Sequence, residues 1–368
     1  MRIICTQENL SHGLQLVSHI ASKNISLPIL NNVLIKAEKG RVSLLTTNLE
    51  IGIICQVRGK VEQEGQFTVQ AKTLSDYISL LPKENVNLEL NEQNLKIECR
   101  NSRTVMKGVE ASEFPLIPEV ETKNNYQIKT SLLKDALLSV VFAVAIDETR
   151  PEISGVYFKF EGDSLVVVAT DSYRLAEKHI KLEKNAGQKF EIIIPLRTIQ
   201  ELIRILSSEE ADSVTISSNE NQILFSFDET KITSRVIEGQ YPDYQQIIPK
   251  EHRTRAVIDT KEFINTIKRA SLFCKPGGND ILIKLDPEGN KIFVSAANLQ
   301  IGESEANQEA VIEGEENSII FNYRFLLDGL QNINEEECIF EMNTSTNPGL
   351  LKLKNKDTQS YIIMPIKQ

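Results

Sequence analysis

The chain contains one segment pattern three times, and this repeat constrains its fold more than any other feature. The copies are LPILNNVLIKAEKGRVSLLTTNLEIG at 27–52, RPEISGVYFKFEGDSLVVVATDSYRLA at 150–176 and GGNDILIKLDPEGNKIFVSAANLQIGE at 277–303. Each indicates an alternating strand, a turn containing glycine, a second strand and a loop that opens at Asn48, Asp171 or Asn298. The copies begin 123 and 127 residues apart in a chain of 368 residues. We therefore expect three similar domains.

The flanking segments repeat as well. A pattern typical of an amphipathic helix precedes each copy, at 8–22, 130–145 and 259–274, with Ser131 and Asp259 as candidate N-caps. A strand that leads into a second helix follows each copy, at 65–81, 188–206 and 317–333. Each third should then hold two helices and six to eight strands, which is an α+β fold. Polar linkers place the domain boundaries at 1–122, 123–252 and 253–368.

Composition narrows the class of protein. Hydrophobic residues make up 41% of the chain and charged residues 25%, so a sizeable core is expected, and the longest apolar runs are far too short to span a membrane. The N-terminus lacks the pattern of a signal peptide, which predicts a cytoplasmic protein. Five cysteines lie far apart without a C-x-x-C pair, so we expect buried, reduced thiols and no zinc site.

The loop ATDSYRLA at 169–176 collects polar side chains that could suggest catalysis. Four histidines lie outside any recognisable motif, and the chain has no phosphate-binding loop and no nucleophile elbow. The equivalent loops read TTNLEIG and SAANLQIG, so the shared Asn or Asp is expected to cap a turn in all three copies. Only Ser172, Tyr173 and Arg174 are peculiar to the middle copy. An enzyme that uses this loop as its active site remains one alternative, and a three-domain scaffold that only binds peptides remains another.

The whole chain resembles the bacterial DNA sliding clamp, the beta subunit of DNA polymerase III. The most specific marks are SLPILNNVLI, ATDSYRLA, EGQYPDY and the terminal SYIIMPIKQ, in the order and spacing of that family. The resemblance implies three tandem clamp domains that form half of a closed ring, with helices around duplex DNA. It implies a homodimeric, non-catalytic processivity factor without a cofactor. The implied partners are the replicative polymerase, a separate clamp loader and other clamp-binding polymerases and repair proteins, with no membrane.

The distribution of charge agrees with a ring on DNA. The chain has a net charge of −10, yet the helical segments sum to +7 and the remainder to −17, where the segments are counted as 9–24, 72–83, 129–145, 197–208, 261–275 and 322–333. Basic helices would attract phosphates without reading bases, while an acidic exterior would repel DNA. The residues predicted to contact DNA are Lys23, Lys72, Lys134, Arg197, Arg204, Lys268, Arg269 and Lys275.

The resemblance also implies an apolar pocket between the second and third domains that binds a short linear peptide. Its predicted wall consists of Ile153, Thr170, Leu175, Pro242, Ile247, Ile362, Ile363, Met364 and Pro365. Its predicted rim consists of Ser172, Tyr173, Arg174, Tyr323 and Ile366. Two positions depart from the family, because Tyr173 stands where His is frequent and Gln246, beside the pocket, replaces a commonly basic residue.

Ring closure requires complementary patches on the first and third domains. Residues 96–107 sum to +3, whereas residues 299–316 contain six glutamates and no basic residue. We predict that Arg100 and Arg103 pair with Glu303 or Glu305 across the dimer interface. The predicted apolar centre of this interface is Met106, Leu272 and Phe273.

Overall fold

The computed structural model describes residues 1–21, 26–118, 120, 124–147, 149–183, 189–275, 277–356 and 358–367. The chain forms two compact units, one of Met1–Thr130 with Gln200–Val236 and the other of Ser131–Ile199 with Ile237–Gln368. We call these unit 1 and unit 2. The middle third of the chain therefore contributes to both units.

The described residues contain two α-helices in each third of the chain, as predicted. The first third comprises β1 (Arg2–Thr6), α1 (Gln7–Ser18), η1 (Pro28–Asn31), β2 (Asn32–Glu38), β3 (Arg41–Thr47), β4 (Ile51–Val57), β5 (Gly59–Gln63), β6 (Gly65–Gln70), α2 (Ala71–Ser79), β7 (Asn85–Asn91), β8 (Asn94–Cys99), β9 (Ser102–Val109) and η2 (Ala111–Glu113). The middle third comprises β10 (Asn124–Lys129), α3 (Thr130–Leu138), η3 (Val141–Ala143), η4 (Pro151–Ile153), β11 (Gly155–Glu161), β12 (Ser164–Thr170), β13 (Arg174–Lys181), β14 (Phe190–Pro195), α4 (Leu196–Ser208), β15 (Ser213–Ser218), β16 (Gln222–Phe227), β17 (Thr230–Arg235) and η5 (Tyr244–Ile247). The last third comprises β18 (Thr254–Asp259), α5 (Thr260–Ser271), β19 (Asp280–Asp286), β20 (Lys291–Asn298), β21 (Gly302–Gly314), β22 (Asn317–Asn322), α6 (Tyr323–Gln331), β23 (Glu337–Met342), β24 (Gly349–Leu353) and β25 (Gln359–Ile363).

Three local details differ from the prediction. The first third has one strand more than expected. Helix α3 ends at Leu138 rather than at 145, because the β-branched run that begins at Val140 has a low helix propensity. Helix α3 also begins at Thr130, so Ser131 lies inside it and is not its N-cap. The other cap is confirmed, since the Asp259 carboxylate accepts a hydrogen bond from the Glu262 backbone N–H at 2.7 Å.

Each unit contains one long antiparallel sheet. The strand order in unit 1 is β10-β15-β16-β17-β4-β3-β2-β6-β9-β8-β7-β1-β5. The order in unit 2 is β14-β11-β12-β13-β25-β24-β23-β18-β21-β20-β19-β22. Four strands of the middle third extend the sheet of the first third, and the other four extend that of the last third. The pairings β17 with β4 and β13 with β25 therefore join consecutive repeats.

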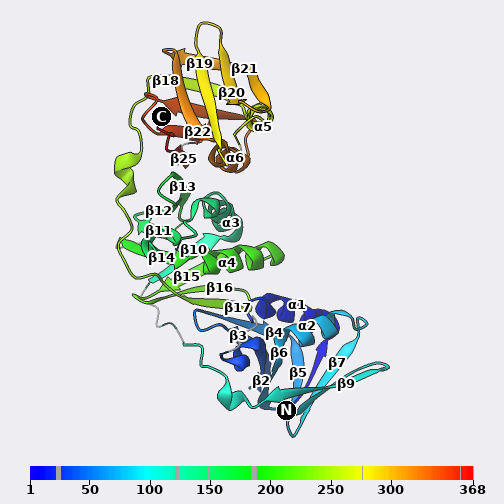
Figure 1. The fold of residues 1–368 in the computed structure, drawn as a ribbon. Helices are drawn as coiled ribbons and strands as arrows, with labels where there is room; N and C mark the ends of the chain where they lie inside the picture. Colours follow the sequence, from blue (N-terminus) through cyan, green and yellow to red (C-terminus); the bar gives the residue numbers. More distant parts are fainter. Residues whose placement is uncertain are drawn as a thin grey trace. The chain divides into compact units, whose positions relative to one another are not determined.

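Pairs of helices cover the sheets. In unit 1, α1 and α2 lie side by side, and in unit 2, α5 and α6 do the same (Figure 1). Helix α1 buries Leu10, Leu14 and Val17, which recur at the three- and four-residue spacing of one helix face. Each such side chain contributes about 1.5–3 kcal/mol when it is fully buried. Among the described residues, no helix combines the length and apolar composition that a membrane crossing requires.

The cysteines are free thiols, and four of them are buried as predicted. Burial raises the pKa of Cys5 and of Cys55 to about 11 and that of Cys338 to about 12. Cys99 is also buried, whereas Cys274 is only half-buried, so the prediction is wrong for that residue. Thiols with raised pKa values stay protonated and unreactive at neutral pH.

Candidate functional site: the junctions between repeats

The three equivalent loops share one hydrogen-bonding scheme. The side-chain Oδ1 atoms of Asn48, Asp171 and Asn298 accept hydrogen bonds from backbone N–H groups two residues further on, at 2.9–3.0 Å. In the first two loops the N–H group three residues further on also donates, at 2.7 and 3.0 Å. The next residue, Leu49 or Ser172, has the same left-handed φ of 76°. The structural role predicted for the shared Asn or Asp is therefore confirmed.

The loops of the first two repeats are attached to the following repeat in the same way. In unit 1 the Arg235 N–H donates to the Glu50 carbonyl oxygen at 3.0 Å. In unit 2 the Met364 N–H donates to the Tyr173 carbonyl oxygen at 2.9 Å. Arg235 and Met364 thus occupy equivalent positions, one in each unit.

Arg174 ties the middle repeat to the last repeat. Its side chain is only 12% exposed, and it donates to Asp171 Oδ2 at 2.9 Å, to the Phe142 carbonyl oxygen at 2.8 Å and to an oxygen of Asp328. The guanidinium also lies 4.6 Å from the centre of the Phe325 ring. Burial opposes the charge, but a neighbouring phenol and the two carboxylates outweigh it and raise the pKa of Arg174. This predicted rim residue therefore holds together the two repeats that flank the predicted pocket.

A buried apolar cluster lies beneath the unit 2 loop. Three of the predicted wall residues, Ile153, Leu175 and Ile362, are members of it. Two further wall residues are buried nearby in the same strands: Thr170 donates through Oγ1 to the Arg174 carbonyl oxygen at 2.7 Å, and Ile363 follows Ile362 on β25. The structure thus brings together residues from η4, β12, β13 and β25.

Three tyrosines complete the cluster, and the sequence did not identify them as site residues. The rings of Tyr157 and Tyr241 are stacked with their centres 4.6 Å apart, and Tyr244 meets both rings edge-on. Tyr241 and Tyr244 belong to the EGQYPDY motif, of which only Pro242 had been selected. The apolar run Val156, Tyr157 and Phe158 in β11 is the signal that could have identified Tyr157 as a buried residue.

A buried carboxylate supports this aromatic group. Glu177 on β13 is hydrogen-bonded to Tyr244, and it lies 3.0 Å from Nε2 of His179. Burial alone would raise the pKa of Glu177, but the hydrogen bonds from His179 and Tyr244 lower it overall. The ionised form of Glu177 is therefore favoured in the folded protein.

The remaining predicted pocket residues lie at the edge of the cluster with differing exposure. Tyr173 is 65% exposed and its ring stacks on Phe325, with the centres 6.4 Å apart. Ser172 is exposed and accepts a hydrogen bond from Arg150, while Gln246 donates to Asp243 at 2.8 Å. The other members are half-buried or exposed and lie at the chain end, in or just before η5, or at the start of α6: Met364, Pro365, Ile366, Pro242, Ile247 and Tyr323.

Most of the basic residues predicted to contact DNA are exposed, whereas Lys23 lies outside the described residues. The exposed members are Lys72, Arg197, Lys268, Arg269 and Lys275, and Lys134 is half-buried in α3. Lys268 and Arg269 lie in the last turn of α5, where a positive charge also favours the helix dipole. Their exposure leaves them available to phosphates.

Arg204 has a structural role that the sequence did not indicate. It forms an ion pair with Glu201 at 2.9 Å and donates to two carbonyl oxygens in the last turn of α1, at 2.7 and 3.2 Å. His12 on α1 pairs with Glu209, which follows α4, and His19, the C-cap residue of α1, pairs with Glu201 on α4. Arg204 thus caps a helix of the neighbouring repeat, so we expect it to contribute less to phosphate binding than the fully exposed residues.

The residues of the predicted dimer interface lie on or beside strands β9 and β21 and just after helix α5. Among the described residues, segment 102–107 of β9 pairs only with β8, and segment 302–307 of β21 pairs only with β20. Exposed apolar side chains accompany both edges, with Val105 at 54%, Ile301 at 59% and Leu272 at 73% exposure. Met106 and Phe273 are half-buried. Unpaired edges of this kind favour association with another strand.

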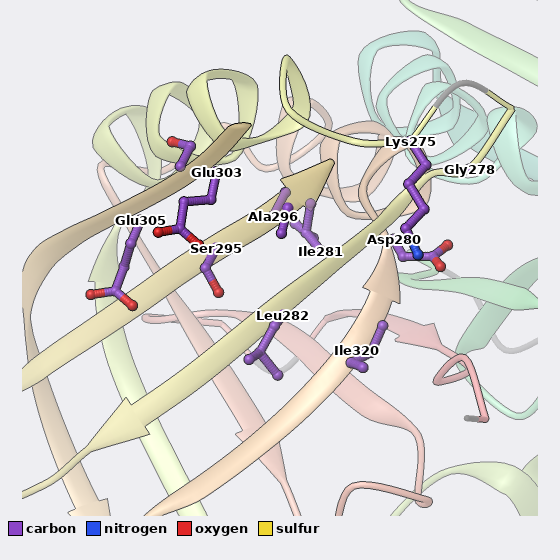
Figure 2. Close-up of a pocket in the computed structure, with 12 residues that line it drawn as sticks. Lys275, Gly278, Asp280, Ile281, Leu282, Ser295, Ala296, Glu303, Glu305 and Ile320 are labelled. Atoms are coloured by element: carbon purple, nitrogen blue, oxygen red, sulfur yellow. The ribbon is translucent and has the colours of Figure 1, made fainter. Parts of the chain in front are cut away.

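The charged residues of the predicted interface are placed differently on the two edges. Arg100 occupies the turn before β9, with a left-handed φ of 49°, and pairs with Glu84 at 3.5 Å. Arg103 extends from β9 and lies 3.6 Å from Glu98. Glu303 and Glu305 stand at one end of a 670 Å³ hollow over β19, β20 and β22, and Lys275 and Asp280 stand at the other end (Figure 2). The structure therefore brings one predicted DNA contact and two predicted interface residues to the same surface.

Comparison with known proteins extends over the whole chain. Family models for the N-terminal, central and C-terminal domains of the DNA polymerase III beta subunit match residues 1–118, 127–243 and 245–367. The beta sliding clamp of Synechococcus elongatus is 32% identical, covering 100% of this chain and 99% of the relative, and that of Bacillus subtilis is 31% identical with full coverage of both. The solved Pseudomonas aeruginosa beta subunit superimposes with a TM-score of 0.96 at 27% identity, with full coverage of both chains. The solved Bacillus subtilis clamp superimposes with a TM-score of 0.95 at 30% identity, and the match covers 100% of this chain and 99% of the clamp.

The threefold α+β repeat and these matches define a processivity clamp of the DNA replication machinery. The chain belongs to the family of bacterial DNA polymerase III beta subunits, the beta sliding clamps. It is accordingly a non-catalytic subunit, and the polar loop at 169–176 is part of a junction between repeats rather than an active site.

Proposed function

We propose that two copies of this chain close into a ring around duplex DNA through β9 of one copy and β21 of the other. The ring would tether the replicative polymerase, other clamp-binding polymerases and repair proteins through peptides held in the unit 2 pocket. A separate clamp loader would open it. The observation that supports closure is that two strand edges, each six residues long and opposite in charge, are left unpaired among the described residues.

The junctions inside the chain supply the expected register. In unit 1, Lys231 of β17 lies opposite Ile54 of β4. Arg103 is the second residue of β9, as Lys231 is of β17, and both strands follow a two-residue turn. Arg103 therefore occupies the position in β9 that Lys231 occupies in β17.

The other edge can be aligned in the same way. Ile54 pairs with Leu45, which lies three residues before Asn48, and Glu305 pairs with Ser295, which lies three residues before Asn298. Glu305 in β21 therefore corresponds to Ile54 in β4. If β9 and β21 of two copies pair as β17 and β4 do, Arg103 lies directly opposite Glu305, with Glu303 diagonal to it.

The distribution of charge supports the encircled DNA. The six predicted helical segments with their flanking residues sum to +7 within a chain of −10, and the helices α1–α6 alone sum to +2. Phosphate contacts of exposed lysine and arginine would hold the duplex without reading its sequence, which is what sliding requires. Exposed Lys268 and Arg269 are the strongest candidates.

The apolar cluster of unit 2 supports peptide binding. It provides a buried base of aliphatic and aromatic side chains, with Met364 and Tyr173 held at its edge by a backbone hydrogen bond. Such a surface anchors apolar side chains of a peptide, and methionine adapts to varied ligands. Arg174 would act by fixing the loop that carries Tyr173.

The ring is tested by topology. Protein loaded by the clamp loader onto nicked circular DNA should stay bound during gel filtration and should be released when the circle is cut once. Equal retention on circular and linear DNA would contradict encirclement and would favour the alternative of a peptide-binding scaffold.

Two further proposals complete this function. We place the domain boundaries at 1–122, 123–252 and 253–368, which limited proteolysis between the domains would test. We also propose a cytoplasmic location, because the DNA and polymerase that the protein serves are there, and cell fractionation would test it.

A further inference from the structure

A second groove lies in unit 1, at the junction between the first and middle repeats. Its volume is 290 Å³, and it is lined by Thr47, Gln222 and residues 49–52, 116–118 and 233–235. Two large apolar side chains, Leu49 and Leu116, are exposed at this groove, Leu116 to 95%. Neither side chain is needed in the core, since both face solvent. Neighbouring exposed apolar groups at a hollow are typical of a binding surface.

The groove has the same construction as the proposed peptide pocket of unit 2. Thr47 Oγ1 donates to the carbonyl oxygen of Ile51 at 3.0 Å, as Thr170 Oγ1 does to that of Arg174 at 2.7 Å. Arg235 takes the place of Met364 at the edge, bonded through its N–H to the preceding loop. Both junctions therefore contain the same three parts. These are the loop, the last strand of the next repeat and a segment that ends in Ile-Pro, at 117–118 in unit 1 and at 248–249 in unit 2.

The two junctions differ in what they would accept. Leu175 of the unit 2 cluster is replaced by Gly52, and the side chain of Ile117 packs against this glycine, where an added Cβ would lie 2.7 Å from it. The η5 turn that carries Tyr244 has no counterpart in segment 114–118. The lining of the unit 1 groove thus lacks the aromatic base of the unit 2 cluster.

Size and charge restrict the ligand. At 290 Å³ the groove is just below the range of about 300–1,000 Å³ that is usual for cofactor and small-molecule sites, so it fits one or two side chains. Both of its strands are paired on their two sides, β4 with β3 and β17 and β17 with β16 and β4, so a ligand cannot be added as a further strand. Recognition must therefore act through side chains.

Arg235 supplies the charge preference. It is exposed, and no carboxylate of the described residues lies within ion-pair distance of its side chain. Glu50 is the other charged residue of the lining. A ligand that places an acidic group beside Arg235 and an aliphatic group between Leu49 and Leu116 would satisfy both features.

We infer that this groove is a second docking site of the clamp, and that its ligand is a linear peptide with aliphatic side chains next to an acidic one. The site rests on the proposed function in one respect, because its mode of binding is inferred by analogy with the pocket in unit 2. It differs from that pocket in selecting an acidic residue and in lacking an aromatic base.

The experiment is methyl NMR of the full-length protein labelled at Ile and Leu methyl groups. The probes are two five-residue acetylated peptides, in which two leucines flank either an aspartate or a lysine. We expect saturable shifts of the Leu49, Leu116 and Ile117 methyl groups, with the aspartate peptide binding at least about threefold more tightly. Arg235→Glu should reverse this preference, and Leu116→Ser should weaken both peptides about tenfold. Both substituted side chains are exposed, so folding should be unaffected.

The methyl groups of Leu175 and Ile362 report separately on the pocket in unit 2. Shifts at these two residues alone would overturn the second site while supporting the first, and shifts in the unit 1 groove alone would do the reverse. Binding that ignores both substitutions would overturn the assignment of the groove. A sedimentation coefficient altered by Leu116→Ser in the absence of peptide would also overturn it, because the groove would then be an interface between copies of this chain.

Discussion

Replacing Arg103 by glutamate should split the dimer. In the expected register Arg103 lies opposite Glu305 and diagonal to Glu303, so the substitution turns two attractions into repulsions. The Arg103 side chain is 67% exposed, and exposed ion pairs contribute only about 0.2–1 kcal/mol each. Charge reversal should therefore cost about 1–2 kcal/mol per junction. A ring has two junctions, which gives about 2–4 kcal/mol, or a dimer Kd raised about 30- to 1,000-fold.

The assay is sedimentation velocity over a dilution series, with the double variant Arg103→Glu, Glu305→Arg as the rescue. The double variant restores opposite charges at both junctions and should recover most of the affinity. Lys231→Glu is the matched control, because Lys231 holds the equivalent position in β17, which is already paired with β4 inside the chain. It should leave the dimer unchanged.

Two results would refute this reasoning. A double variant no tighter than Arg103→Glu alone would show that the two side chains do not face each other. An equal loss of affinity in Lys231→Glu would show that the effect comes from net charge rather than from the β9 edge.

Three further outcomes follow from unit 2. Arg174→Ala should lower the free energy of unfolding by about 2–4 kcal/mol in urea, since it leaves the largely buried Asp171 carboxylate without its cation and removes the contact with Phe325, and an unchanged midpoint would contradict the network. The folded pKa of Glu177 lies below its unfolded value of about 4.3, so its carboxylate stabilises the fold above that pH and loses this contribution as the pH falls through the folded pKa. The melting temperature of Glu177→Gln should thus lie below that of the wild type at pH 7, and the two should converge towards pH 3. A difference in melting temperature that stays constant with pH would count against this role. Met364→Ala should weaken a fluorescent peptide from the polymerase catalytic subunit about tenfold without changing dimerisation, and a loss of the dimer instead would show that Met364 belongs to the interface.

Local features of the fold could be predicted because they depend on neighbouring residues. The capping role of Asp171 follows from a short side chain that reaches backbone N–H groups two or three residues away, and Asp259 caps α5 in the same way. The turn glycines show the limit of such reasoning. Gly162 adopts the left-handed φ of 60°, but in the third copy Asn290, with a φ of 48°, takes that conformation instead of Gly289. The turn between β19 and β20 is longer than that between β11 and β12, and its left-handed residue lies one position after the glycine.

Contacts between distant segments could not be predicted in this way. Arg174 was selected as a rim residue, yet its partners Phe142 and Asp328 come from a 3₁₀ turn and a helix far away in the chain. Arg204 was selected for its charge, but the end of α1 engages its guanidinium. A positive charge on a predicted helix does not reveal whether it faces phosphate or a neighbouring carbonyl oxygen.

The sequence by itself determined the threefold repeat, the α+β composition of each third and the family, because these depend on periodicity and local spacing that every copy displays. Only the tertiary structure decided how the repeats are joined. Strand pairing between repeats places Met364 against the Tyr173 loop and Arg235 against the Glu50 loop. It also leaves the edges of β9 and β21 unpaired among the described residues. The physical reason is that backbone hydrogen bonds between strands carry no residue code, so their partners are settled by packing across the whole sheet.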